Sequence, residues 1–107
     1  MLHVVDTVEV EPEHVDEYLR VVGSEGIGVM TAAGARFGGC RTTAKHLGEA
    51  VLVEVTWEAD DHEHWNAVRK ALVLDPRWYA YGDRLSALRT GGRRRFFYPT
   101  RLGAPPL

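Results

Sequence analysis

The sequence predicts an α+β domain in which helices cover one face of an antiparallel sheet of four strands. Residues 2–10, 36–43, 50–57 and 94–98 show the apolar alternation of strands. Helical stripes separate the first strand from the second and the third from the fourth. The 107 residues are 45% apolar, which suits a single core. This order indicates a ferredoxin-like βαββαβ fold, and we expect residues 1–100 to form it as one domain.

The first predicted strand has two different faces. Its apolar face carries Leu2, Val4, Val8 and Val10, and the other face carries His3, Val5, Thr7 and Glu9. Asp6 lies on the apolar face as its one charge. Glu11 and Pro12 then end the strand and open a helix, because proline suits the first helical turn.

The helix after this strand has an apolar stripe interrupted by glycines. The stripe runs through Val15, Tyr18, Leu19, Val22, Val29 and Met30. Glycines at 23, 26 and 28 each weaken a helix by about 1 kcal/mol relative to alanine. The pattern therefore allows one long weakened helix or two helices with a kink. Gly26 lies on the inward face, where a missing side chain would leave space.

Two strands follow, and the second is the stronger. Gly38 and Gly39 predict a bulge in the strand over 36–43. Residues 44–49 predict a turn. In the strand over 50–57, one face carries Val51, Val53, Val55 and Trp57, and the other carries Leu52, Glu54 and Thr56.

The second half of the chain predicts two helices and a last strand. Asp60 or Asp61 caps the first helix, and Asp75 with Pro76 starts the second. Their inward faces carry Trp65, Val68, Leu72, Trp78, Tyr81, Leu85 and Leu88. Gly91 and Gly92 predict the end of the second helix before the strand over 94–98. The tail over 101–107 contains GAPPL and should be poorly ordered.

One face of the predicted sheet has no helix to cover it. Its residues are mixed, with Val5 and Leu52 beside His3 and Glu54. Such a face is too apolar for water alone. A second copy of the same sheet would cover it and close a barrel, so we expect a homodimer.

Composition argues against several classes of partner. The net charge is −2 with acids and bases mixed, which disfavours a nucleic-acid-binding face. The run Arg93–Arg95 is interpreted as a solvated strand start in preference to an anion site. Apolar runs stay well below the roughly 18 residues of a membrane span. The N-terminal residues lack a signal-like pattern, so we expect a cytoplasmic protein.

Several segments together resemble the NIPSNAP-like families of the dimeric α/β-barrel superfamily. They are VEVEPEHVDEYL, GARFGGCRT, VTWEA and LDPRWYAYGDRL, of which DPRWYAY is the most specific. The resemblance covers roughly residues 3–100. It implies an aromatic residue at the end of the third strand, which Trp57 matches.

The resemblance also sets a range of expected activities. The superfamily includes cofactor-free monooxygenases, polyketide cyclases, lactone isomerases, haem-degrading enzymes and ligand-binding modules. Because one fold carries all of these, the fold does not settle the function. Asn66 stands where haem-degrading relatives carry their ligand histidine, so the resemblance disfavours haem.

Asp6 is the first candidate for catalysis. A desolvated carboxylate has a raised pKa and suits a general base. Arg41 could stabilise an anion that develops beside it. The competing interpretation is a structural salt bridge between Asp6 and an arginine such as Arg36 or Arg41.

Histidines near residue 62 give a weaker candidate. Neighbours two apart on a helix point about 200° apart, so His62 and His64 cannot share a metal ion. We therefore expect no metal and no cofactor. His64 could still edge a pocket as an acid or base. Cys40 is expected to be a small buried hydrophobe.

Aromatic residues on the helix side could line a pocket for a flat ligand. The predicted lining is Val8, Phe37, Trp57, Trp65, Trp78 and Tyr81. The leading hypothesis is a cofactor-independent enzyme that acts on an aromatic or polyketide-like molecule, by cyclisation or isomerisation or by cofactor-free oxygenation. The alternative is a non-catalytic ligand-binding or interaction dimer. In an enzyme Asp6 would face an open pocket, whereas in a binding module it would be paired and the space filled.

Overall fold

A computed structural model describes residues 1–44, 49–100 and 102–103. The turn predicted over 44–49 and the tail predicted over 101–107 fall largely outside these residues. The elements, in order, are β1 (Leu2–Val10), the 3₁₀ turn η1 (Pro12–His14), α1 (Val15–Val21), the π-helical η2 (Val22–Gly26), α2 (Ile27–Ala32), β2 (Arg36–Thr42), β3 (Val51–Ala59), α3 (His62–Val73), α4 (Pro76–Leu88) and β4 (Arg89–Phe97). The predicted ferredoxin-like α+β fold is confirmed.

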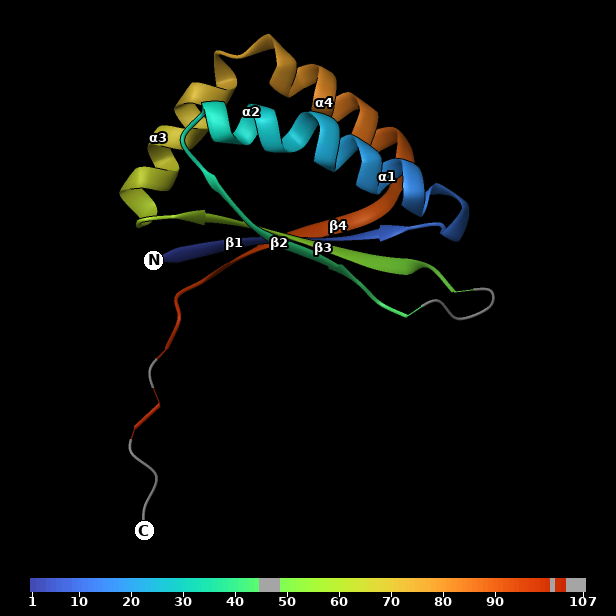
Figure 1. Cartoon of the computed structure of the whole chain (residues 1–107), viewed down its shortest axis with the longest axis horizontal. Coiled ribbons are helices and arrows are strands. Elements are labelled where there is room, and N and C mark those ends of the chain that lie inside the picture. Colours follow the sequence, from blue (N-terminus) through green and yellow to red (C-terminus); the bar gives the residue numbers. More distant parts are fainter. Residues whose placement is uncertain (45–48, 101, 104–107) are drawn as a thin grey trace.

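The sheet has the order β2-β3-β1-β4, with every neighbouring pair antiparallel. All helices lie on one side of it, and none of the described residues forms an element that covers the other side (Figure 1). β1 is a central strand, so its residues face partners on both sides. Asp6 stands opposite Val55 of β3 and opposite Arg94 of β4.

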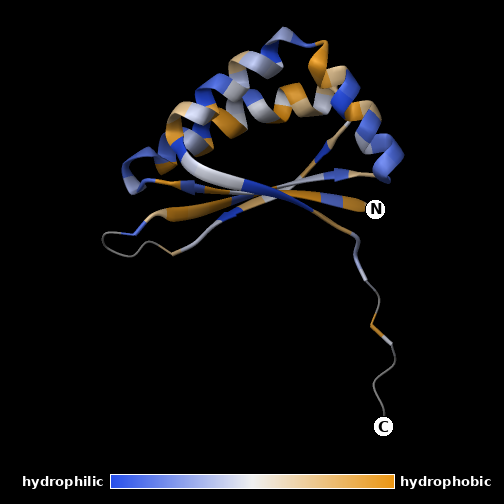
Figure 2. Ribbon diagram, turned by 180° about the vertical axis from the view of Figure 1, so that it is seen from behind, coloured by the Kyte–Doolittle hydropathy of each residue, from blue (hydrophilic) through white to orange (hydrophobic). Residues whose placement is uncertain are grey.

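The core lies between the sheet and the helices. Alternate residues of β1 and β3 are buried, with the partly exposed Asp6 as the exception, which confirms the faces predicted for these two strands. Figure 2 shows the same two layers from behind, with hydrophobic segments in the strands and the helices. Buried helix residues that meet them include Val15, Tyr18, Met30, Trp65, Val68, Leu72 and Tyr81.

The glycine-containing helix is continuous. From Val15 to Ala32 the chain stays helical, with α1 and α2 joined by the π-helical η2. A π-helical turn accommodates an extra residue without breaking the helix. The interpretation of one long, weakened helix is therefore closer to the structure than two separate helices. Gly34, with a φ of +106°, ends the segment.

Helix starts follow the sequence signals. Asp61 accepts a hydrogen bond from the backbone N–H of His64, so Asp61 is the cap of α3. Asp75 caps α4 by accepting from the backbone N–H of Arg77, with Pro76 in the first turn. Both caps satisfy backbone donors that the helix itself leaves free.

The end of α4 differs from the prediction. The helix stops at Leu88, and Gly91 and Gly92 lie inside β4. A Cβ atom at Gly92 would lie only 2.9 Å from Cγ1 of Val8, its partner on β1. The glycine therefore serves a close approach between strands and not a helix stop. The bulge predicted in β2 is confirmed by a register shift between Phe37 and Gly39.

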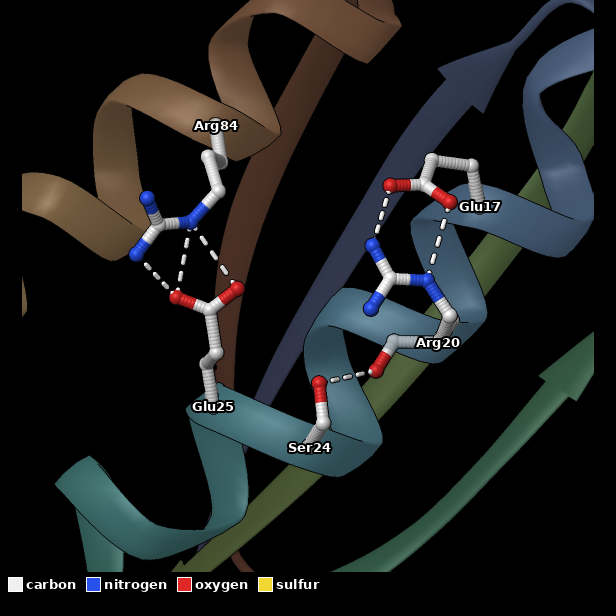
Figure 3. A network of polar contacts seen from close by, with 5 residues as sticks. All are labelled: Glu17, Arg20, Ser24, Glu25 and Arg84. Carbon is white, nitrogen blue, oxygen red and sulfur yellow. Dashed lines mark hydrogen bonds and ion pairs between the residues drawn. The ribbon is translucent and has the colours of Figure 1, made fainter.

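An ion pair ties two helices together above the sheet. Arg84 of α4 donates from Nε to both carboxylate oxygens of Glu25 in η2, at 2.7 and 2.9 Å (Figure 3). Glu17, Arg20 and Ser24 form a second, separate set of polar contacts on the same helical segment (Figure 3). Within the described ranges, no helix combines the length and apolar character that crossing a membrane requires.

Candidate functional site

A cavity of about 460 Å³ lies between the helices and the sheet. Side chains of β1, β3, α1, α2 and α4 line it, together with the start of β4. Its apolar lining consists of Val8, Met30, Val55, Trp57, Trp78 and Leu85. Its polar lining includes Asp6, Tyr18, Tyr81, Ser86, Arg89 and Arg94. This combination of apolar walls and a few polar groups is typical of small-molecule sites.

The central polar feature is an ion pair between Asp6 and Arg94. Nε of Arg94 donates to Oδ1 of Asp6 at 2.6 Å, and Nη2 donates to Oδ2 at 2.9 Å. The two residues face each other across β1 and β4, so strand register sets their alignment. Their side chains are 25% and 34% exposed. Asp6 is thus paired with an arginine, and the partner is Arg94 in place of Arg36 or Arg41.

The ring of Trp65 packs against the guanidinium of Arg94. The guanidinium carbon lies 5.2 Å from the centre of the Trp65 ring, a cation–π arrangement. Trp65 is buried, and Phe96 packs edge-on against it. Burial alone would lower the pKa of Arg94, but the hydrogen bond and charge of Asp6 raise it. Arg94 is therefore a fixed cation that borders the cavity.

Two buried tyrosines contribute hydroxyl groups to the cavity. Burial raises the pKa of Tyr18 to about 12 and also raises the pKa of Tyr81. Among tyrosine hydroxyls in the described residues, only that of Tyr79 has a hydrogen-bond partner, the Val73 carbonyl. The hydroxyls of Tyr18 and Tyr81 are therefore protonated donors that remain available to a ligand.

Gly26 does not leave the space that the sequence predicts. A Cβ atom at this position would lie 2.5 Å from the Tyr81 hydroxyl oxygen and 2.7 Å from Cζ. The Tyr81 side chain fills the inward space, and Gly26 permits its close approach to η2. Gly28 has nothing within 4 Å of its Cβ position and is exposed, so it does not enlarge the cavity either.

The structure brings most of the predicted lining together. Asp6, Val8, Trp57, Trp78 and Tyr81 all border the cavity.

Two predicted lining residues lie beside the cavity instead. Trp65 stacks on Arg94, as described above. Phe37 is 41% exposed on the edge strand β2 and packs edge-on against Trp57, with ring centres 5.6 Å apart. Each of them touches a lining residue without bordering the cavity.

Neither Arg41 nor His64 reaches Asp6. Arg41 donates from Nε to Glu54 at 2.7 Å on the uncovered face of the sheet. Nδ1 of His64 accepts the backbone N–H of Asp60 at 2.8 Å, near the start of α3. Arg41 and Asp6 lie on opposite faces of the sheet. His64 is held outside the cavity by its hydrogen bonds at the start of α3.

The uncovered face carries its own polar pairs. His3 lies 3.8 Å from Glu58, whereas Glu54 pairs with Arg41. Leu52 and Phe97 are 39% and 48% exposed in the same region.

Cys40 and the metal prediction concern other parts of the site. The Cys40 side chain is exposed, contrary to the buried position expected for it, because β2 is an edge strand. Within the described part of the chain, no three His, Cys, Asp or Glu residues gather as a metal site would require.

The sequence did not identify several polar lining residues, among them Tyr18, Arg89 and Arg94. Arg94 belongs to the run 93–95, which the sequence predicts to be a solvated strand start. Its side chain instead faces the helices, because Arg94 pairs with Asp6 of β1. Tyr18 was placed in the core, without a role for its hydroxyl. Arg89 had no signal of its own, since it directly follows α4. Strand parity within 93–95, combined with the βαββαβ order, could have identified Arg94.

Comparisons with known proteins support the fold. No family model matches the chain, and no curated protein matches it. The chain is similar to the crystal structure of an uncharacterized NIPSNAP domain protein from Burkholderia xenovorans, with 28% identity and a TM-score of 0.78. That match covers 98% of this chain and 100% of the other. The resemblance to NIPSNAP-like proteins predicted from the sequence is confirmed.

Two oxygenases share the fold at lower identity. SnoaB, a cofactor-independent oxygenase from Streptomyces nogalater, has 17% identity and a TM-score of 0.60, with 94% of each chain covered. A monooxygenase from the gene ActVA-Orf6 of Streptomyces coelicolor, in complex with the ligand Nanaomycin D, has 20% identity and a TM-score of 0.61. It covers 98% of this chain and 92% of its own. At these identities the likeness shows the fold alone.

Proposed function

We propose that this NIPSNAP-like chain binds a flat aromatic or polyketide-like molecule in the cavity between sheet and helices and transforms it without a cofactor. The observation that carries the proposal is the group of Asp6, Arg94, Tyr18 and Tyr81 on the wall of an otherwise apolar cavity. Trp57 and Trp78 supply broad aromatic surfaces for a flat ring system. The two oxygenases of the same fold are consistent with such chemistry.

The polar group suits reactions that pass through an enolate or phenolate. Removal of a proton from an acidic C–H or O–H leaves negative charge on an oxygen of the substrate. Arg94 and the hydroxyls of Tyr18 and Tyr81 are donors that would stabilise that oxygen. Asp6 would accept the proton. Cyclisation, isomerisation and oxygenation all share this first step, and oxygenation adds dioxygen as the oxidant.

Pairing with Arg94 restricts which substrates Asp6 could deprotonate. Both carboxylate oxygens of Asp6 already accept a hydrogen bond from the Arg94 guanidinium before a substrate binds. We infer that the substrate carries an already acidic proton, such as that of a polyphenol or a 1,3-dicarbonyl.

A homodimer is part of the proposal. The sheet face with Val5, Leu52 and Phe97 has no covering element among the described residues (Figure 1). A second copy packed on this face would remove its apolar side chains from water and would satisfy polar groups beside them.

The alternative function is a binding dimer without catalysis. The ion pair at Asp6 favours the binding dimer, because a module without catalysis is expected to have this carboxylate paired. The open cavity argues against a purely structural module, because side chains would then fill that space, and it is compatible with both catalysis and ligand binding.

A turnover assay separates these two functions. The purified protein is incubated in air with a panel of hydroxyanthrones and 1,3-dicarbonyl polyketide analogues, and oxygen uptake and product masses are recorded. For an enzyme, Tyr81→Phe should lower turnover by about 10²–10³-fold, the usual value of one oxyanion donor. Tyr79→Phe is the matched control, since that hydroxyl binds a backbone carbonyl outside the cavity. Tight binding without turnover of any compound would contradict the enzyme and support the alternative.

A further inference from the structure

The charges that line the cavity do not balance. Among the described residues, Arg89, Arg93 and Arg94 line it, and Asp6 is the only carboxylate in the lining. Arg93 pairs with Thr7, so by strand alternation its side chain lies on the uncovered face of the sheet, which leaves Arg89 and Arg94 as the cations on the cavity side. Arg94 and Asp6 neutralise each other through their two hydrogen bonds. The cavity therefore keeps an excess of positive charge that no lining residue compensates.

Arg89 is the cation best placed to bind a negatively charged group of a ligand in the cavity. It follows the last residue of α4, and its Nη1 would lie 3.4 Å from a Cβ atom at Gly92. Gly92 pairs with Val8, whose side chain faces the cavity, so the guanidinium lies over β4 on the helix side of the sheet. A side chain at position 92 would compete for this space.

Arg89 lacks a carboxylate partner within the described residues. Eight ion pairs occur there, and none includes Arg89. The positive charge of Arg89 acts on the Tyr18 hydroxyl, since it lowers the pKa of Tyr18 against the larger rise caused by burial. Arg89 and the Tyr18 hydroxyl are thus two donors that border the cavity and have no hydrogen-bond or ion-pair partner among the described residues.

We propose that the ligand of this cavity is an aromatic anion whose carboxylate or similar acidic group binds Arg89, with the Tyr18 hydroxyl as second donor. The proposal rests on the proposed function and adds the chemical class of the ligand. The ring system would lie against Trp57 and Trp78. Charge-assisted hydrogen bonds to a guanidinium are shorter and stronger than neutral ones, so the anionic group would set the orientation of the ligand.

Two fluorescent probes of nearly the same shape test the charge. 8-Anilino-1-naphthalenesulfonate carries an anionic sulfonate, and N-phenyl-1-naphthylamine is the same skeleton without it. Fluorescence titrations give the Kd of each probe for the wild-type protein, Arg89→Gln and Arg69→Gln. Arg69 is an exposed residue of α3 outside the cavity lining, so its variant matches the change in net charge.

We expect Arg89→Gln to weaken the anionic probe by about tenfold (about 1.4 kcal/mol) and to leave the neutral probe unchanged. Arg69→Gln should leave both unchanged. Equal loss of the anionic probe in both variants would overturn the inference, because it would reflect net charge only.

A third variant separates failure of the inference from failure of the proposed function. Leu85→Trp adds bulk to a lining residue, so it should weaken both probes. If it does, and Arg89→Gln changes neither, the cavity binds ligands but the preference for an anion is wrong. If Leu85→Trp affects neither probe, the cavity is not the binding site and both proposals fail.

Discussion

Arg94 binds both carboxylate oxygens of Asp6, at 2.6 and 2.9 Å, from a position 88 residues further along the chain. The pair joins the central strand β1 to the edge strand β4 on the face that carries the cavity. Trp65 lies beside the guanidinium and helps to hold it. The polar centre of the cavity thus depends on the correct pairing of two strands from opposite ends of the sequence.

The ion pair should be energetically coupled. Asp6→Asn and Arg94→Gln should each destabilise the fold by about 1–3 kcal/mol, because each leaves a partly buried group without its partner. The double variant should lose less than the sum, with a coupling of about 1–2 kcal/mol in urea unfolding. Additive losses would mean that solvent screens the pair and that it does not hold the site.

Two glycines should respond in opposite directions to the same substitution. Gly26→Ala should destabilise the protein by about 1–3 kcal/mol, because its Cβ would collide with the Tyr81 ring. Gly28→Ala should stabilise it by up to about 1 kcal/mol, since that position is open and helical. Thermal unfolding of both variants checks this. Stabilisation by both would show that Tyr81 does not occupy the place next to Gly26.

The buried tyrosines predict a loss of stability in alkali. The pKa of Tyr18 rises from 10.0 to about 12, and that of Tyr81 rises as well, both through burial. Above pH 10 the unfolded chain releases protons that the folded chain retains, so stability falls with rising pH. The slope should approach about 1.4 kcal/mol per pH unit for each tyrosine between pH 10 and 12.

Urea unfolding at several pH values measures this slope. Tyr18→Phe removes one titrating group, so it should make the slope shallower between pH 10 and 12. Tyr79→Phe serves as the control because Tyr79 is exposed. An equal slope in the wild-type protein and in Tyr18→Phe would contradict a buried, protonated Tyr18.

A charge on the uncovered sheet face should disrupt the dimer. Leu52 is 39% exposed and stands among the residues of that face. Leu52→Asp should weaken association by about 100-fold or more, because an unpaired carboxylate in an apolar contact costs several kcal/mol. Leu74→Asp is the control, since Leu74 is 83% exposed at the end of α3. Sedimentation that finds a monomer for the wild-type protein at micromolar concentration would refute the dimer.

Local patterns in the sequence were sufficient for most of the fold. The alternation in β1 and β3 and the Asp75-Pro76 helix start each depend on neighbouring residues, and the structure confirms them. Gly91 and Gly92 misled the prediction, because a glycine pair after a helix usually ends it. The actual role of Gly92 comes from its close approach to Val8, a residue distant in the sequence.

The site was predictable only in part for the same reason. Asp6 and Trp57 follow from strand parity within their own segments. Arg94 follows from the pairing of β1 with β4, which the sequence does not state. Arg41 was predicted on the wrong face of the sheet. The bulge at Gly38 and Gly39 shifts the register of β2, so the alternation before the bulge does not give the face of Arg41.

The three tryptophans give the most direct test of the cavity as the ligand site. Trp57 and Trp78 line it, whereas Trp65 lies outside the lining. In ¹H–¹⁵N spectra, assigned with single Trp→Phe variants, titration with 8-anilino-1-naphthalenesulfonate should move the indole signals of Trp57 and Trp78 with one common Kd. The Trp65 signal should move far less. Saturable binding that leaves Trp57 and Trp78 unmoved would place the ligand elsewhere and contradict the account.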